Sequence, residues 1–153
     1  MKKSTRRRPE VESLESMMLL STFVHAEAHT SRPPVVVSSQ VTLRGTIHAK
    51  GNLTGDTLTI AGSGNLGKVG NASFNLNTSL LAPTSTATLS TRGGRINLVA
   101  NNGSVFGSNS GTITYTIQGG SGSHASAFGS GTIHVSLTQI NGTKVKADLR
   151  FTA

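Results

Sequence analysis

The chain has 153 residues, a length that corresponds to one domain, and carries a formal net charge of +8 at pH 7. It contains no cysteine, which excludes disulfides, thiolate chemistry and zinc sites built from cysteine. No stretch approaches the roughly 20 consecutive apolar residues that a membrane-spanning helix needs, so we expect no transmembrane segment.

Residues 1–34 differ from the rest of the chain and have the order of an export segment. A basic head at residues 2–8 precedes a short apolar run at residues 17–20, and the small residues at 26–28 form an A-x-A cleavage pattern. The paired prolines Pro33 and Pro34 then indicate a linker, because proline disfavours both helix and central strand. We therefore predict a basic targeting segment and linker at 1–34, and an extracytoplasmic location.

Part of this segment resembles a known motif. Arg7-Arg8-Pro9, followed by Leu-Glu-Ser-Met-Met-Leu-Leu-Ser at residues 14–21, is similar to the LEPR-XLL motif of large exported or surface proteins of certain bacteria. The family has Arg where this chain has Met17. The resemblance implies export. Val11, Leu14 and Met18 also have the spacing of a short amphipathic helix, with a disordered basic tail as the alternative.

From residue 35 onward, apolar and polar residues alternate almost throughout, which is typical of half-buried strands. The expected inward residues of the eight successive strands are Val41, Leu43, Ile47, Ala49; Leu58, Ile60; Ala72, Phe74, Leu76, Leu80; Ala87, Leu89; Ile96, Leu98, Ala100; Ile113, Tyr115, Ile117; Ile133, Val135, Leu137; and Val145, Ala147, Leu149, Phe151. Asn102-Gly103 and Asn141-Gly142 are typical of tight hairpin turns.

No helical segment interrupts this series, so the sequence predicts an all-β domain over residues 35–153. Each strand has one apolar face, and an open antiparallel sheet would leave two unpaired edges. Closure removes both edges. We therefore expect a single antiparallel eight-stranded barrel preceded by a short helical or disordered N-terminal segment.

Residues 117–131 form a glycine-rich connection between two predicted strands, with the sequence Ile-Gln-Gly-Gly-Ser-Gly-Ser-His-Ala-Ser-Ala-Phe-Gly-Ser-Gly. The glycines favour positive φ angles and close backbone approach. The segment resembles G-G-[ST]-G-x-[FY]-x-x-A-x-G of the allene oxide cyclase and dirigent barrels, and is closer to uncharacterised bacterial relatives of that barrel. These relatives also carry a G-x-L-G element, matched here by residues 64–67. The resemblance covers residues 40–139 and implies an allene-oxide-cyclase-like barrel.

The resemblance does not extend to catalytic residues. His124 stands where the family has an aromatic residue, and Phe128 follows a few positions later. Allene oxide cyclases depend on a buried Glu, but the last Glu of this chain is Glu27, and only Asp56 and Asp148 lie beyond it. Dirigent proteins use paired aspartates and an arginine in their cavity. We therefore predict no catalytic residue and no cofactor, and leave open whether the protein is an enzyme.

The interior of the predicted barrel could be a filled core or hold a small ligand. The candidates for lining a cavity are Phe74, Tyr115, His124 and Phe128. Small interior residues would leave room: Gly45, Ala49, Ala72, Ala87, Ala100 and Ala147. We predict no metal site, because His48 and His134 fall in the polar phase of their strands. A Ser-His-Asp site is disfavoured because the sequence has no nucleophile elbow.

Charge bears on the choice of partner. The predicted barrel has eight basic residues and two acidic ones, a net charge of +6. Such a surface can bind polyanions such as acidic polysaccharide or anionic lipid, and the alternative is a solvated surface whose charge keeps copies of the protein apart. With one Tyr and no Trp, the chain lacks the aromatic platform of nucleic-acid binders. We expect an exported bacterial module with a non-enzymatic structural or binding role at the cell surface or in an extracytoplasmic compartment. The alternatives are a carrier of a small apolar ligand and a cyclase or isomerase.

Overall fold

The computed structural model describes residues 37–102 and 109–153. The predicted targeting segment at 1–34, with its LEPR-XLL-like motif, lies outside the described residues. The described strands are β1 (Ser39–Gln40), β2 (Gly45–Thr54), β3 (Thr57–Asn65), β4 (Asn71–Ser79), β5 (Thr84–Thr91), β6 (Gly94–Asn101), β7 (Ser110–Gly120), β8 (Ala127–Asn141) and β9 (Lys144–Thr152). Two single-turn helices, η1 (Gly67–Val69) and η3 (Gly122–His124), accompany them, and no helix in the described part could cross a membrane.

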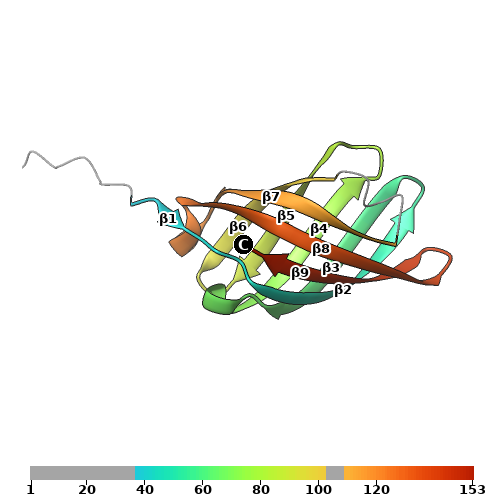
Figure 1. Ribbon diagram of the computed structural model, residues 1–153, viewed down its shortest axis with the longest axis horizontal. Coiled ribbons are helices and arrows are strands. Elements are labelled where there is room, and N and C mark those ends of the chain that lie inside the picture. The colour runs from blue at the N-terminus through green and yellow to red at the C-terminus, as the bar shows by residue number, and fades with distance from the viewer. Residues whose placement is uncertain (1–36, 103–108) are drawn as a thin grey trace, which may run out of the picture. The chain divides into compact units, whose positions relative to one another are not determined.

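The strands β2 to β9 form a closed antiparallel barrel, which confirms the predicted fold class (Figure 1). Each strand pairs with the next along the chain, and β9 then pairs with β2 from Gly45↔Phe151 to Asn52↔Lys144. The meander closes on itself because its first and last long strands are neighbours. Every long strand therefore has partners on both sides, and one face of each strand points into a shared interior.

The interior contains one continuous apolar core to which every long strand contributes. Phe151 lies among the aromatic residues, with its ring centroid 5.7 Å from that of Tyr115 and 6.3 Å from that of Phe74, both in edge-to-face geometry. The predicted facing of the last two strands is confirmed by the pairs Ile133↔Phe151, Val135↔Leu149 and Leu137↔Ala147. Both members of each pair are fully or partly buried.

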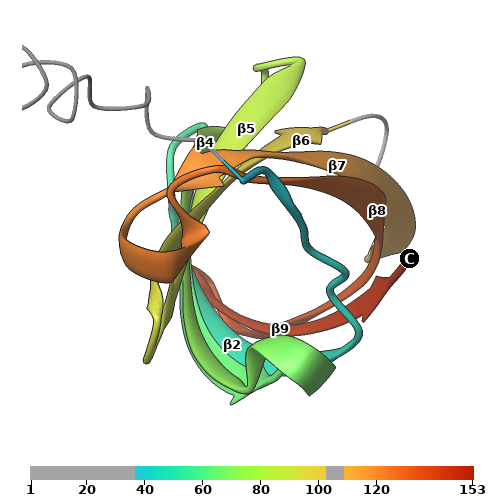
Figure 2. The same cartoon turned by 90° about the vertical axis from the view of Figure 1, so that its left-hand side faces the viewer.

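The start of the first long strand was predicted incorrectly. The alternation of Val41 and Leu43 suggested that the strand begins there, but β2 begins at Gly45, and residues 41–44 cross one end of the barrel instead (Figure 2). Leu43 belongs to this crossing segment, and it is completely buried. The preceding β1 pairs in parallel with Ala127 and Phe128 of β8, where β9 has already ended. The alternation of apolar and polar residues at 41–44 correctly predicts that Leu43 is buried, but not that these residues lie outside a strand.

The expected two-residue turn at Asn102-Gly103 is also wrong, since β6 ends at Asn101 and β7 begins only at Ser110. The side chain of Asn102 is buried, donates to the Ala82 carbonyl at 2.7 Å and accepts a hydrogen bond from Ser85. The Ser85 and Thr78 hydroxyls lie 2.7 Å apart. Asn102 is therefore part of a buried polar cluster. Its high propensity for turns predicted a different role. At Asn141-Gly142 the chain does form the expected tight hairpin, with Asn141 paired to Lys144.

The glycine-rich connection folds over the turn between β5 and β6. The His124 Nε2 atom lies 3.1 Å from the Thr91 hydroxyl, and Ser123 donates to the Gly93 carbonyl at 3.0 Å. Gly122 has φ +62°, and a Cβ there would collide with the Gly93 carbonyl oxygen. These contacts hold the connection against the turn, so its glycines serve close backbone packing.

Replacing Phe151 with Ala should lower the free energy of unfolding by about 3–5 kcal/mol, because it removes the ring that contacts both Tyr115 and Phe74. Urea denaturation of the wild type and the variant measures this difference. A cost below about 1 kcal/mol would be incompatible with a ring that is 1% exposed and packed in the core.

Gly122→Ala should destabilise the fold by at least about 1–2 kcal/mol, since alanine at positive φ is strained and its methyl group would meet the Gly93 carbonyl. Gly142→Ala is the matched control, because Gly142 does not have a positive φ and a Cβ there would have no neighbour within 4 Å. Thermal unfolding of both variants decides the matter. Equal melting temperatures would show that the connection does not pack on the β5–β6 turn as described.

Candidate functional site

The outward side of the β2–β9 pair gathers much of the charge of the barrel. We call the basic ribbon the cations Lys50 of β2 and Lys144, Lys146 and Arg150 of β9, all exposed. These are four of the eight lysines and arginines found in residues 37–153. In the register of the two strands, Lys50 stands opposite Lys146, and Asn52 stands opposite Lys144.

The next three strands contrast sharply with the ribbon, because β3, β4 and β5 contain no charged residue. Their outward positions carry short polar side chains and one alanine: Thr57, Thr59, Ala61, Ser63, Asn65, Asn71, Ser73, Asn75, Asn77, Ser79, Thr84, Thr86, Thr88 and Ser90. The positive potential is therefore uneven around the barrel. A cationic strip borders a wide neutral face of hydroxyl and amide groups.

The pairing of Lys50 with Lys146 is unfavourable for folding. Directly opposed residues on one face of an antiparallel pair have Cβ atoms about 4.5–5.5 Å apart, and like charges at that distance destabilise the sheet. Lys144 lies diagonal to Lys50 on the same face. The pair of strands thus places three lysines at neighbouring positions of one face, where Asp148 is the one carboxylate among the residues of β2 and β9. Such a cluster is an attractive surface for anions.

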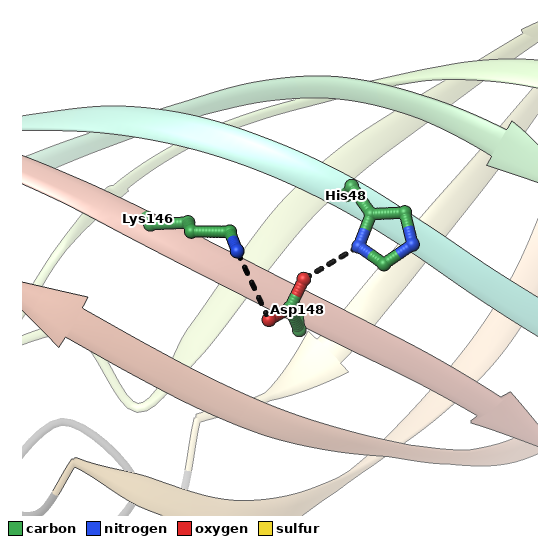
Figure 3. A network of polar contacts seen from close by, with 3 residues as sticks. All are labelled: His48, Lys146 and Asp148. Carbon is green, nitrogen blue, oxygen red and sulfur yellow. Dashed lines mark hydrogen bonds and ion pairs between the residues drawn. The ribbon is translucent and has the colours of Figure 1, made fainter.

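One carboxylate moderates the ribbon (Figure 3). Asp148 Oδ1 lies 2.6 Å from His48 Nδ1, and its other oxygen lies 4.0 Å from the Lys146 ammonium group. The hydrogen bond from His48 is the main cause of a lowered Asp148 pKa, and Lys146 contributes a smaller attraction. His48 and Asp148 lie 100 positions apart, and no local pattern links them. Their shared outward phase on the first and last long strands was the available signal, and barrel closure makes them neighbours.

A groove opens beside the ribbon where β3 carries its only outward residue without a polar side chain, Ala61. Ala61 lies between Lys50 of β2 and Asn75 of β4 in register. The groove has a volume of about 390 Å³ and is lined by Lys50, Gly51, Asn52, Thr59, Ile60, Ala61, Asn75, Ile140, Lys144 and Val145. We call it the Ala61 groove. It combines two cations, neutral hydrogen-bonding groups and the exposed apolar side chain of Ile140.

Two further hollows lie along β9, and Arg150 lines both of them. The first, of about 530 Å³, includes His134, whose Nδ1 atom lies 2.8 Å from the Thr112 hydroxyl. The second, of about 420 Å³, is lined by Arg44 as well as Arg150 and lies where β2 begins and β9 ends. Basic side chains therefore border three hollows along one strand.

The structure separates the four residues that were predicted to line an interior cavity. Phe74 and Tyr115 are buried in the core and both contact Phe151. His124 is part of the clamp over the β5–β6 turn. Phe128 was assigned to the cavity incorrectly, because it occupies the outward phase of β8 and is 46% exposed. Its inward neighbours are Ala127 and Gly129.

Tyr115 carries a buried hydroxyl group for which no hydrogen-bond partner is found among the described residues. Burial raises the pKa of Tyr115, and the nearby Leu43 backbone opposes that shift only in part. The hydroxyl occupies the space in which a Cβ of the opposite residue, Gly131, would stand. Tyr115 thus fills a gap left by a glycine on the neighbouring strand, and packing accounts for its position.

His48 and Asp148 have the residue types of the histidine and the carboxylate in a Ser-His-Asp catalytic triad. Ser63, the one serine opposite His48 in register, is the candidate for the third member. The described contacts include no hydrogen bond from Ser63 to the imidazole, and the His48 side chain is 71% exposed. Nothing there excludes water or supplies an oxyanion site. Within residues 37–102 and 109–153, no three His, Asp or Glu side chains are grouped so that they could hold a metal ion.

The pairing with His48 should be visible in the titration of Asp148. Replacing His48 with Ala should raise the pKa of the Asp148 carboxyl toward its usual value, whereas Lys146→Gln should raise it less, because the hydrogen bond is the larger cause. Carbon-detected NMR titration measures both. The native pKa is lowered, so any stability from this pair is present above the unfolded-state pKa and is lost as pH falls through the native value. Identical titrations in wild type and His48→Ala would disprove the pairing.

Comparisons of the chain with models of protein families, with curated proteins and with solved structures returned no match.

Proposed function

We propose that this protein is an exported, non-enzymatic binding module that holds acidic polysaccharide along its basic ribbon. The observation that carries the proposal is the placement of Lys50 directly opposite Lys146, with Lys144 on the diagonal. This arrangement costs stability unless an anion neutralises it. Alternate residues of a strand are about 6.6–6.8 Å apart on one face, so Lys144, Lys146 and Arg150 lie along a line that an extended polyanion can follow, with the single carboxylate of Asp148 between Lys146 and Arg150.

Two features of the barrel support a binding role on its outer surface. The interior positions of β2 to β9 belong to one packed core with interlocking aromatic rings, which leaves an apolar carrier role without a specific supporting contact. The hollows along β9 are lined by polar and basic residues, among them Lys50, Lys144, His134 and Arg150, together with apolar residues such as Ile140. Exposed aromatic rings, on which bases of single-stranded nucleic acid stack, are absent from the described ribbon.

The proposal also includes export from the cytoplasm and kinship with a known barrel family, and both rest on the amino-acid sequence. The basic head, apolar run and A-x-A pattern of residues 1–34, together with the LEPR-XLL-like string, support an extracytoplasmic or surface location in a bacterium. The glycine-rich connection supports kinship with the allene-oxide-cyclase-like barrels. The acidic residues on which those enzymes depend have no counterpart in this barrel, which supports binding without catalysis.

The triple variant Lys50→Gln, Lys144→Gln, Lys146→Gln should weaken binding to polygalacturonate about a hundredfold, because each cation near an anionic surface contributes about 1 kcal/mol and 1.4 kcal/mol is a factor of ten. Isothermal titration calorimetry at low ionic strength measures the dissociation constants. The matched control removes three charges elsewhere, as Lys68→Gln, Arg92→Gln, Arg95→Gln. It should bind within a few-fold of wild type.

Three results would contradict this function. The first is equal loss in both triple variants, which would indicate a response to net charge alone. The second is binding of neutral dextran as tight as that of polygalacturonate. The third is preferential binding of single-stranded DNA or of phosphatidylglycerol vesicles at matched charge concentration, which would identify another class of partner.

A further inference from the structure

We infer that the Ala61 groove is a binding subsite for one carboxylated sugar unit, and that it recognises the unit by its shape as well as its charge. This inference rests on the proposed polysaccharide function and names the place where one unit of such a polymer would be read. The basic ribbon attracts any polyanion. The groove adds a bounded site beside the ribbon, and its lining contains cationic, amide, hydroxyl and apolar groups.

The cationic side of the groove is formed by Lys50 and Lys144. They are diagonal neighbours on the outward face of the β2–β9 pair, and their flexible side chains border the same groove. Lysine ammonium groups are compact point charges, whereas the planar guanidinium of arginine suits bidentate recognition. Two lysines that converge on one site suit a single carboxylate placed between them. No acidic residue lines the groove.

The neutral side supplies hydrogen bonds from Asn52, Thr59 and Asn75. The Thr59 hydroxyl donates to the backbone carbonyl of Asn52 at 3.3 Å, so the Thr59 hydroxyl oxygen can still accept a hydrogen bond. The side-chain amides of Asn52 and Asn75 have no hydrogen-bond partner within the described residues. Each amide offers donors and an acceptor to the same hollow. Vicinal hydroxyl groups of a sugar ring both donate and accept, and they match such amides.

Two separate apolar groups line the groove: the Ala61 methyl group on β3, and Ile140 on β8, which is 58% exposed. Ile140 therefore offers an exposed hydrocarbon surface at the groove, and the C–H face of a pyranose ring matches such a surface. The volume of about 390 Å³ lies within the range of small-ligand sites. The cationic, amide and hydrocarbon groups that line the groove correspond to the carboxylate, the hydroxyl groups and the ring of a uronic acid.

The test uses trigalacturonate, with maltotriose as the neutral trisaccharide of equal length, and the full chain labelled with ¹⁵N. We expect trigalacturonate to shift the side-chain amide signals of Asn52 and Asn75, and maltotriose to leave them unchanged. Ala61→Leu fills the groove without altering charge and should weaken trigalacturonate binding about tenfold or more, while polygalacturonate still binds along the ribbon within a few-fold. Ser63→Leu, two residues along the same outward face, is the matched control and should bind as wild type.

Asn75→Ala provides a second variant should Ala61→Leu fail to fold, and it should weaken trigalacturonate binding about three- to tenfold. The inference is overturned if trigalacturonate does not shift these amides, if maltotriose shifts them equally, or if Ala61→Leu and Asn75→Ala bind trigalacturonate as wild type does. Inorganic sulfate that displaces trigalacturonate completely at equal concentration would also overturn it, because recognition would then be of charge alone. If trigalacturonate binds in the groove but polygalacturonate does not follow the ribbon, the proposed function fails while the subsite stands.

Discussion

The pairing of β9 with β2 is the constraint on which the rest of this structure depends. It converts a meander of eight strands into a closed barrel, so that no long strand keeps an unpaired edge. It also places Phe151 in the interior beside Tyr115 and Phe74, where the end of the chain anchors the core. On the outer side, the same pairing brings Lys50 next to Lys146 and His48 next to Asp148. One set of backbone hydrogen bonds thus determines both the core and the charged surface.

The ends of the barrel use different chemistry. At one end, the chain crosses the opening after β1 and buries Leu43, so the closure is apolar. At the other, Thr78, Ser85 and Asn102 share hydrogen bonds within a buried polar cluster. A buried polar cluster is stable only when its groups satisfy one another, and it then fixes a single arrangement.

Much of this fold can be predicted from the sequence, because the inward phase of each strand follows from a period of two. The facing of Ile133 toward Phe151 follows from that phase and from the hairpin at Asn141-Gly142. Phase does not say which distant strands pair, however. The neighbourhood of His48 and Asp148 depends on closure and could not be found from either local pattern. Phe128 does not line the interior, because it follows the buried Ala127 on β8 and the alternation of that strand directs it outward.

The candidate site illustrates a conflict between stability and binding that ionic strength should expose in two opposite ways. The three lysines around the β2–β9 pair repel one another, so screening them with salt relieves the folded barrel. The same screening weakens the attraction of a polyanion to the ribbon. The Debye length falls from about 10 Å at 0.1 M salt to about 3 Å at 1 M, which spans the distances between these side chains. Solubility alone does not require cations on directly opposed positions, since interspersed charges of both signs achieve it without that cost. Placing Lys50 opposite Lys146, while the neighbouring β3, β4 and β5 are neutral, concentrates the unfavourable charge where an anion can compensate for it.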